Sequence, residues 1–388
     1  MGKKRWKTVA LVLAGGQGGR LEPLTEKRSK PVMPFGGTYR LIDIALSNLH
    51  HSELSEVWVV EQYRPHGLND HLNGGRPWDL DRTRGGLLVM PPFEGKGEDH
   101  DGFAAGNAEA LNLQRQFLEQ AAPDFVLVLS ADHLYRFDYR DLIDFHVEQK
   151  ADLSVLLWEA PEGMDLTRYS LFETEGDKVT GFAYKPDEPR SNLVGTEVFL
   201  YSTGALLDAL EGLHDEHEGK LGDYGDHLLP LMVEQSKVRA LKLDGYWRDV
   251  GTIESYWQAH QDLLAEQPAF PLDHDGWPLL TDQPFRSPAR IEASARIERS
   301  LISPSCWIEG TVRNSVIGPG CRIEKGALVE DSVLLDGCRV GPSGRLRKAI
   351  VEAGSDLDES FGDGEEVQVF YPEENRRSKP RRTRRPFD

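Results

Sequence analysis

A glycine-rich segment near the start of the chain carries residues suited to phosphate chemistry. The segment Ala14-Gly15-Gly16-Gln17-Gly18-Gly19-Arg20-Leu21 follows an apolar run at residues 9–13, and Lys30 comes soon after it. Glycines in a turn after a strand let backbone N–H groups approach phosphate oxygens closely. Cations neutralise charge on a transferring phosphoryl group and on departing pyrophosphate. We therefore predict that Arg20 and Lys30 are catalytic.

The same segment lacks two common phosphate-binding signatures. No Gly-Lys-Ser/Thr follows at the spacing of a Walker A loop, and the glycines do not form a clean GxGxxG dinucleotide fingerprint. These two classes of nucleotide site are therefore disfavoured.

Two aspartates far apart in the sequence are candidate metal ligands. Asp132 follows an apolar run at residues 125–129, and Asp249 lies in the segment Gly245-Tyr246-Trp247-Arg248-Asp249-Val250-Gly251-Thr252. A carboxylate beyond the carboxyl end of a strand is placed to hold Mg²⁺ against a triphosphate, and Mg²⁺ typically takes one or two protein carboxylates. Either residue alone is as well explained as a helix cap or a turn aspartate.

The first 266 residues alternate short apolar runs with amphipathic stretches. Runs at 9–13, 57–60, 125–129 and 153–158 predict buried strands, whereas 108–121 and 252–266 predict helices. This alternation predicts a Rossmann-like α/β domain with a mostly parallel sheet covered by helices on both faces. Ligands of such sheets bind beyond the carboxyl ends of the strands.

From about residue 289 the periodicity changes. Aliphatic residues recur mostly at steps of five or six, a hexapeptide pattern that predicts a left-handed parallel β-helix. They are Ile291, Ile297, Ile302, Ile308, Val312, Ile317, Ile323, Val329, Leu335, Val340, Leu346 and Val351. A small residue lies two positions before almost every one of them, and only Val333 is larger.

All three cysteines of the chain fall at these small positions. Cys306, Cys321 and Cys338 lack the CxxC spacing of a zinc or redox site. Free cysteine commonly behaves as a small buried hydrophobe. We therefore predict that the three thiols lie inside the β-helix.

These patterns divide the chain into four parts. We expect the α/β domain at residues 1–266, a linker rich in Pro and Asp at 267–288, the β-helix at 289–360 and a tail at 361–388. The end of the tail is basic and is expected to be disordered. Its cations are Arg376, Arg377, Lys379, Arg381, Arg382, Arg384 and Arg385.

Composition limits the partners of the protein. The formal net charge of the 388 residues is −19, so the body of the protein should repel nucleic acid and anionic membranes. No apolar run approaches the roughly 20 residues that a membrane helix needs. The N-terminal residues 1–7 do not form a signal peptide, so we expect a cytoplasmic protein.

The motifs, taken together and in order, resemble the bacterial glucose-1-phosphate adenylyltransferase (ADP-glucose pyrophosphorylase) family. The resemblance covers nearly the whole chain apart from the basic tail. The matching segments are 15–21, 30–37, 39–43, 47–48, 62–63, 68–71, 129–133 and 245–252.

The resemblance implies a reaction, a cofactor and a set of site residues. The implied reaction joins ATP and glucose 1-phosphate into ADP-glucose and pyrophosphate, for glycogen or other α-glucan synthesis. Mg²⁺ would be held by Asp132 and Asp249, and Arg20, Lys30 and Asp132 would be catalytic. The nucleotide would contact Leu13, Ala14, Gly15, Gly16, Gly18, Gln62 and Gly106. The family is typically tetrameric, so a homotetramer is expected.

The implied chemistry needs no general base. A sugar phosphate is already ionised near neutral pH, so its oxygen attacks the α-phosphorus in line while pyrophosphate leaves. Catalysis would then rest on positioning and on charge neutralisation. His133, beside Asp132, is expected to support the loop rather than to transfer a proton.

The sugar half of the site departs from the family pattern. The family's Glu-Lys-Pro reads Tyr184-Lys185-Pro186 here, so Lys185 is retained while a carboxylate becomes a tyrosine. The sugar 1-phosphate is still expected to contact Tyr184, Lys185 and Gly195. A site that hydrogen-bonds a particular hydroxyl discriminates strongly, so changed donors imply a changed preference. Thr38 replaces a family lysine, which leaves Lys27, Arg28 and Arg40 as candidate effector contacts.

Three alternatives stay open at this stage. The enzyme could use another sugar 1-phosphate or another base, or the chain could be a non-catalytic regulatory paralogue. Acyl transfer, known for other hexapeptide β-helices, is disfavoured because no histidine follows His274.

Overall fold

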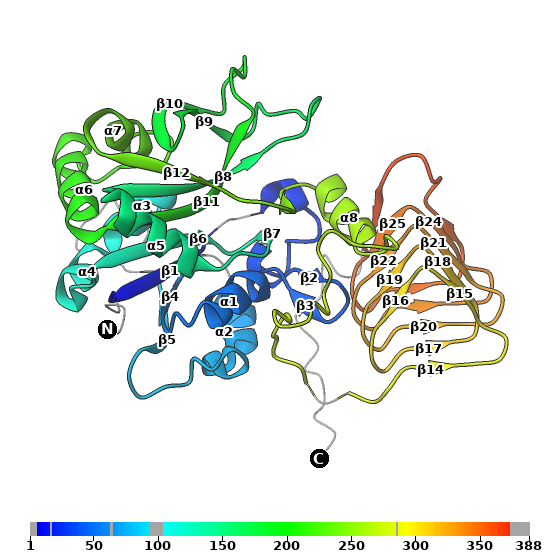
Figure 1. The fold of residues 1–388 in the computed structure, drawn as a ribbon. Helices are drawn as coiled ribbons and strands as arrows, with labels where there is room; N and C mark the ends of the chain where they lie inside the picture. The colour runs from blue at the N-terminus through cyan, green and yellow to red at the C-terminus, as the bar shows by residue number, and fades with distance from the viewer. Residues whose placement is uncertain (1–5, 16–17, 63–64, 93–103, 285, 373–388) are drawn as a thin grey trace.

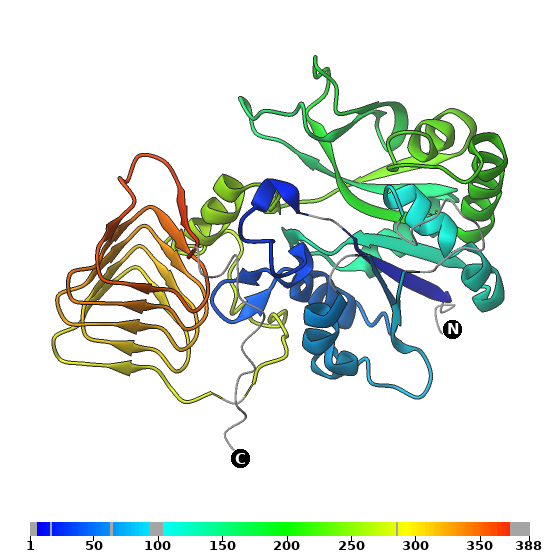
Figure 2. The same cartoon turned by 180° about the vertical axis from the view of Figure 1, so that it is seen from behind.

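The structure, a computed structural model, describes residues 6–15, 18–62, 65–92, 104–284 and 286–372. An α/β domain and a β-helix lie side by side, with helix α8 (Ile253–Asp262) between them (Figure 1). The view from behind shows the same arrangement (Figure 2). The fold class expected from the periodicities is confirmed.

Within the described residues, the α/β domain is built on a sheet of nine strands. Their spatial order is β5 (Gly86–Met90), β4 (Glu56–Glu61), β1 (Thr8–Ala14), β6 (Phe125–Ser130), β11 (Leu193–Ser202), β8 (Leu153–Glu159), β12 (Val238–Lys242), β10 (Lys178–Tyr184) and β9 (Ser170–Glu175). Strands β5, β4, β1 and β6 are parallel, and β8 is parallel to β12. Strand β11 runs antiparallel to both of its neighbours, β6 and β8. The carboxyl ends of β1, β4 and β6 therefore meet at one edge of the sheet.

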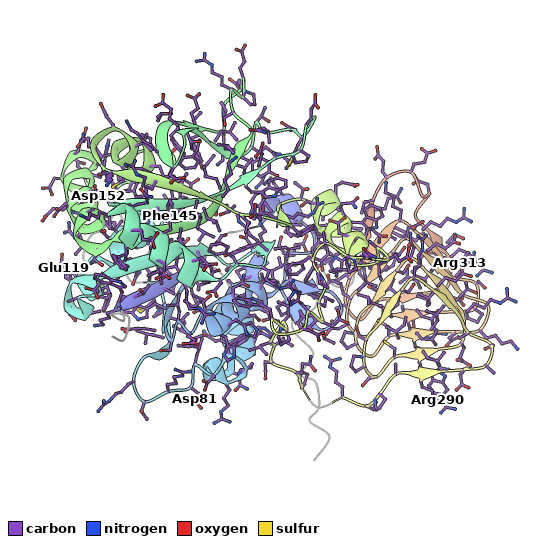
Figure 3. All side chains as sticks on the ribbon, viewed as in Figure 1. Asp81, Glu119, Phe145, Asp152, Arg290 and Arg313 are labelled. Carbon is purple, nitrogen blue, oxygen red and sulfur yellow. The ribbon has the colours of Figure 1, made fainter. Side chains whose placement is uncertain are left out.

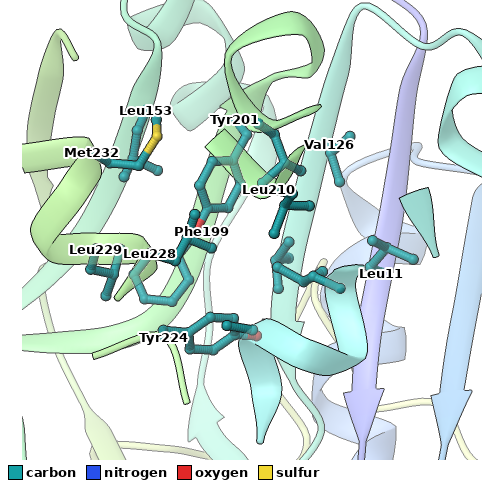
Figure 4. Close-up of a cluster of buried hydrophobic side chains, with 14 of the residues drawn as sticks. Leu11, Val126, Leu153, Phe199, Tyr201, Leu210, Tyr224, Leu228, Leu229 and Met232 are labelled. Atoms are coloured by element: carbon teal, nitrogen blue, oxygen red, sulfur yellow. The ribbon is translucent and has the colours of Figure 1, made fainter. Parts of the chain in front are cut away.

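Both faces of the sheet are buried because alternate residues of a strand point to opposite sides. On β1, Leu11 packs into one apolar cluster and Val12 into the other. Figure 4 shows part of the first cluster, in which Leu11 and Val126 lie near Phe199, Tyr201 and Leu210.

Each face is covered by its own set of helices. One face carries α1 (Ile42–His51), α2 (Pro65–Leu72) and α5 (Tyr139–Gln149). The other carries α3 (Asn107–Leu113), α4 (Arg115–Ala121), α6 (Thr203–His217) and α7 (Leu228–Gln235). The helix expected at 108–121 is thus two helices joined at Gln114. None of the helices in the described part of the chain is long and apolar enough to cross a bilayer.

Short elements outside the main sheet complete the domain. Turns of 3₁₀ helix form at Gly19–Leu21, Lys30–Val32 and Asn73–Trp78. Strand β2 (Pro34–Phe35) pairs with β3 (Tyr39–Arg40), and β7 (His133–Tyr135) pairs with β13 (Trp247–Asp249). The second pair brings the two candidate metal-binding segments together.

The C-terminal region forms three parallel sheets, one for each face of the β-helix. The first contains β14 (Arg290–Ile291), β17 (Trp307–Ile308), β20 (Arg322–Ile323), β23 (Arg339–Val340) and β26 (Asp356–Leu357). The second contains β15 (Arg296–Glu298), β18 (Thr311–Arg313), β21 (Leu328–Glu330), β24 (Arg345–Arg347) and β27 (Ser360–Phe361). The third contains β16 (Leu301–Ile302), β19 (Val316–Ile317), β22 (Val333–Leu334), β25 (Ala349–Val351) and β28 (Gln368–Phe370). Strand β28 lies beyond residue 360, where we expected the coils to end.

The interior of the β-helix agrees with the repeat except at one coil. The three cysteines are buried and free among the aliphatic residues, which confirms their expected place. In β22, however, Leu334 pairs with Ile317 and faces inward, so the inward assignment of Leu335 was wrong. The small residue of that coil is Ser332, and Val333 points outward with Leu335, against the α/β domain. The apparent exception at Val333 came from a register shifted by one residue.

A third apolar cluster joins the two parts. Met33 and Phe35 of the α/β domain share it with Val333, Leu335 and Ile350 of the β-helix. Residues 267–288, expected as a linker, also pack there and along α1. Phe270 and Leu279 are buried, and the Leu280 N–H donates to Ser47 Oγ at 2.9 Å.

Candidate active site

The glycine-rich turn lies at the carboxyl end of β1, as expected for a ligand site. Gly18 has φ +68°, a left-handed conformation, and a Cβ there would lie 2.9 Å from Thr25 Cγ2. Thr25 Oγ1 donates to the Gly18 carbonyl at 2.9 Å and closes the turn. Glycine is therefore required at position 18 for both conformation and space. Gly16, a predicted nucleotide contact, lies outside the described residues.

Two further predicted contacts, Gly15 and Gly106, lie where a neighbouring segment leaves no room for a side chain. A Cβ on Gly15 would lie 2.7 Å from the side chain of Gln62, which follows the end of β4. A Cβ on Gly106 would lie 2.2 Å from the Gly222 backbone. The two glycines therefore let neighbouring segments pack closely beside the glycine-rich turn.

The charged centre of the site is Lys30 with the two candidate metal ligands. Lys30 Nζ lies 2.5 Å from Asp132 Oδ2 and 3.2 Å from Asp249 Oδ1. Asp132 precedes β7, and the pairing of β7 with β13 places Asp249 opposite His133. The two carboxylates, far apart in the chain, thus converge on one ammonium group.

This convergence sets the charge states of the three groups. Burial lowers the pKa of Lys30, but the Asp132 and Asp249 carboxylates more than offset it and hold that pKa above its usual value. Burial raises the pKa of each aspartate, and Lys30 together with His133 holds both pKa values below their usual range. At neutral pH the centre is therefore one ammonium between two ionised carboxylates.

His133 connects this centre to β11. Its Nδ1 lies 3.0 Å from the Thr196 carbonyl oxygen, and its Nε2 lies 3.7 Å from both Asp132 Oδ1 and Asp249 Oδ1. Burial lowers the pKa of His133, while Glu197, Asp132 and Asp249 raise it above its usual value overall. The ring is held by the backbone on one side and faces the carboxylates on the other, as a supporting residue would be.

A cavity of about 650 Å³ opens directly over the charged centre. Such a volume suits a nucleotide-sized ligand. Its lining contains these predicted residues: Leu13, Gly15, Gly18, Arg20, Lys30, Gln62, Gly106, Asp132 and Asp249. Ala14 is not part of the lining, because its side chain packs in the core beneath the turn.

Arg20 reaches the same centre from the turn. A Cβ on Gly251 would lie 3.2 Å from Arg20 Nη2 and 2.9 Å from Asp249 Oδ2, so the guanidinium and this carboxylate flank one glycine. Arg20 also lines a second cavity of about 120 Å³ next to the first. Both predicted cations therefore lie on the lining of the larger cavity together with Asp249.

The second cavity contains the predicted sugar contacts. Tyr184, Lys185 and Gly195 all line it. The Tyr184 hydroxyl donates to Asp223 Oδ2 at 2.8 Å, and Lys185 Nζ donates to the Tyr184 hydroxyl at 2.5 Å. Burial, followed by the bond to Asp223, raises the pKa of Tyr184, which stays protonated at neutral pH.

Several lining residues were not predicted. Glu197, Asp223, Arg168 and Trp247 line the smaller cavity, and Glu197 and Asp223 line the larger one too. Trp247 lies within the matching segment 245–252, two residues before Asp249, and could have been predicted as a lining residue from that position. Asp223 directly follows Gly222, and Glu197 stands two residues after the predicted sugar contact Gly195, so both also lie beside residues that could have drawn attention to them.

Comparison with known proteins agrees with this geometry. Residues 9–266 match the family model described as nucleotidyl transferase, and residues 287–369 match the one described as GlmU-like, C-terminal hexapeptide. The chain is 36% identical over 375 residues to proteins named glucose-1-phosphate adenylyltransferase from Bacillus thuringiensis (strain Al Hakam) and Bacillus mycoides (strain KBAB4). In both cases 96% of this chain and 96% of the relative are covered.

Proposed function

This chain belongs to the glucose-1-phosphate adenylyltransferase family, and on that premise we propose that it converts ATP and glucose 1-phosphate into ADP-glucose and pyrophosphate. The observation that carries the proposal is the convergence of Asp132 and Asp249 on Lys30, beneath a nucleotide-sized cavity bounded by the glycine turn. A smaller cavity with Lys185 adjoins it and suits the sugar 1-phosphate. The product would supply glycogen or other α-glucan synthesis.

In this proposal the cations act on charge and position. Lys185 and Arg20, on the smaller cavity, would hold the phosphate of the sugar, whose ionised oxygen attacks the α-phosphorus of ATP. Arg20 and Lys30 would neutralise charge on the transferring group and on departing pyrophosphate. The phosphate oxygen is already ionised, so no protein group has to remove a proton from it.

Mg²⁺ is the metal that fits the two aspartates best. They are ionised, converge on one cation and open onto the larger cavity, where phosphate oxygens and water would complete an octahedral shell. Among the described residues no group of three or more His, Cys, Asp or Glu side chains could hold a metal, so the nucleotide would supply the remaining ligands. When bound, Mg²⁺ would orient the triphosphate and neutralise its charge.

The nucleoside would lie along the turn and the end of β4. Leu13, Gly15, Gly18, Gln62 and Gly106 line the cavity on that side. Gln62 is buried against Gly15, so its amide is held in place to contact the base. Gly16 and Ala14 belong to the same proposed turn, where their backbone groups would be the contacts.

Pyrophosphate release across a panel of nucleoside triphosphates and sugar 1-phosphates tests the proposal. We expect the highest kcat/KM with ATP and glucose 1-phosphate, and a fall of about a thousandfold or more in Asp132→Asn, because a charge beside the reacting phosphate is lost. The matched control is Asp356→Asn on the exposed face of the β-helix, which should retain wild-type activity. No ADP-sugar from any sugar, or full activity in Asp132→Asn, would contradict the proposal.

Self-association forms part of the same proposal. The first coil of the β-helix leaves β14, β15 and β16 each paired on one side only, and Ile291 there is 50% exposed. Unpaired strand edges and exposed apolar side chains favour association with another chain. We expect a homotetramer by light scattering, and a monomer at micromolar concentration would contradict this part.

A further inference from the structure

Glu197 lies at an irregularity in β11 that faces both cavities. The pairing of β11 with β8 shifts register between Gly195 and Phe199, and Glu197 falls inside this bulge. Its φ is +56°, in the left-handed region that residues with a side chain avoid. Bulges are typical of strands that redirect a side chain beside an active site.

The left-handed φ alone does not mark a site, because other residues with side chains share it, among them Glu218 at the end of α6. Glycine would adopt the same φ without strain, so the fold gains nothing from a side chain here. Strained residues of this kind cluster at ligand sites, where the surrounding structure holds them in place. What distinguishes Glu197 is its position, because the bulge in β11 places it on the lining of both cavities.

Among the described carboxylates that line the cavities, Glu197 differs in having no hydrogen-bond or ion-pair partner. Asp132 and Asp249 bind Lys30. Asp223 accepts from the Tyr184 hydroxyl on one oxygen and from the Asn107 N–H, at 3.2 Å, on the other. The proposed site thus offers one carboxylate acceptor whose bonding capacity is unused.

Its position fits a sugar better than a triphosphate. Glu197 shares both cavities with His133 and Asp249, so it stands where the two substrates would meet. Burial, followed by the nearby Asp132 and Asp249, raises the pKa of Glu197, while His133 opposes this shift. A carboxylate would repel phosphate oxygens, whereas a hydroxyl group can donate to it.

We propose that Glu197 is a sugar-recognition residue whose carboxylate accepts a hydrogen bond from a hydroxyl of the pyranose ring. The inference rests on the proposed sugar nucleotidyltransferase function and assigns the sugar contact to β11. Once a bound sugar covers this acceptor, leaving it without a donor would be costly, so the residue would select sugars that carry a hydroxyl at one ring position. Glu197 would contact substrate without taking part in the phosphoryl transfer.

The first experiment compares Glu197→Gly with Glu218→Gly. Glu218 is a matched control because it has φ +54°, ends α6 on the surface and lines neither cavity. We expect both variants to keep or raise the thermal unfolding midpoint, since glycine relieves the same backbone strain. Only Glu197→Gly should raise KM for the sugar 1-phosphate, by about tenfold or more, with KM for ATP within about twofold.

The second experiment identifies the contact with monodeoxy analogues of the preferred sugar 1-phosphate. With wild type, we expect the analogue that lacks the recognised hydroxyl to have a kcat/KM about a hundredfold below that of the intact sugar. With Glu197→Gly, we expect this loss to disappear, while the losses measured for the other analogues stay the same. If Glu197 had only a structural role, its replacement would not abolish the kcat/KM loss for one deoxy analogue alone.

The outcomes separate this inference from the proposed function. If wild type is active but Glu197→Gly keeps its sugar KM, or keeps every deoxy penalty, the inference alone is overturned. If wild type turns over no sugar 1-phosphate, the proposed function fails and this inference fails with it.

Discussion

The α/β domain and the β-helix place their charged residues in opposite ways. In the α/β domain, Lys30, Asp132 and Asp249 come from distant segments and meet beneath a cavity. In the β-helix, arginines and acidic residues pair with neighbours one coil away on the outer faces, as Arg313 does with Glu330 at 3.1 Å. The side chains of Arg290 and Arg313 extend from the outside of the β-helix (Figure 3).

This contrast distinguishes buried charged residues at a cavity, which can act in a reaction, from exposed ion pairs, which face solvent. Buried charges are costly unless they are paired, so a buried cluster opening onto a cavity indicates a functional site. Exposed pairs are screened by water and contribute little to stability. The interior of the β-helix, by contrast, is apolar in its described coils, with aliphatic and small residues and, at the last coil, Phe361 and Phe370.

The largest expected effect is on catalysis in the α/β domain. Lys30→Met removes the cation that the two carboxylates share, and we expect kcat to fall by about a thousandfold or more. Lys325→Met, an exposed lysine of the β-helix, is the control and should keep wild-type kcat. The kcat of both variants is measured by steady-state pyrophosphate release. Similar kcat values for the two variants would contradict the assignment of catalysis to the α/β domain.

The next effect is on the stability of the β-helix. Leu346 points into the coil and Leu328, one coil below on the same sheet, points outward. Leu346→Ala should lower the free energy of unfolding by about 3 kcal/mol through a cavity, and Leu328→Ala by less than about 1 kcal/mol. Urea unfolding distinguishes the two, and equal losses would contradict the inward register.

A pH effect should arise from the α/β domain rather than from the β-helix, which has no histidine. Burial lowers the pKa of His146 and of His260 to about 4. Between pH 6.5 and 4 the unfolded chain therefore binds protons that the folded chain does not, so stability falls as the pH falls. At pH 5 each histidine should cost about 2 kcal/mol relative to pH 8.

The variant His260→Leu isolates this effect. Urea unfolding at pH 8 and pH 5 should show a smaller loss of stability in the variant than in wild type, because one of the two buried groups no longer titrates. An unchanged loss between the two pH values would show that His260 is not buried in its neutral form.

The smallest effect is expected for the ion pairs between neighbouring coils on the outer faces of the β-helix. Arg313→Ala removes the pair with Glu330 on a partly exposed face. We expect a loss of less than about 1 kcal/mol in the free energy of unfolding and no change in kcat. A loss of several kcal/mol would mean that these pairs stabilise the coils, and the comparison of the two regions would need revision.

Much of the fold was predictable because its patterns are local. The runs at 9–13 and 125–129 have the length and composition of buried strands, and both lie within strands of the sheet. The repeat from residue 289 predicted three sheets and the place of the cysteines. The error over which of Leu334 and Leu335 points inward shows where a local pattern fails. A coil that packs on another domain has apolar residues on both faces, so hydrophobicity no longer distinguishes the inward positions.

The site was predictable only where the residues stood in recognisable motifs. Arg20, Lys30, Asp132 and Asp249, which stand in such motifs, all line one cavity, and their catalytic roles stay predictions. Glu197 and Asp223 were missed although Gly195 and Gly222 stand close to them in the sequence. A bulge in β11 and the turn at Gly222, beside Gly106, bring them to the cavities, and the sequence does not show where a bulge or turn directs a side chain.

The sequence by itself determined the two kinds of periodicity, the glycine turn and the four charged residues, because these follow from residue type and spacing along the chain. Tertiary structure decided how these charges meet and which further residues join them. The pairing of β7 with β13 joins Asp132 to Asp249, and the bulge in β11 turns Glu197 toward the cavities. Electrostatic interaction depends on distance and burial in space, and those quantities exist only once distant segments pack together.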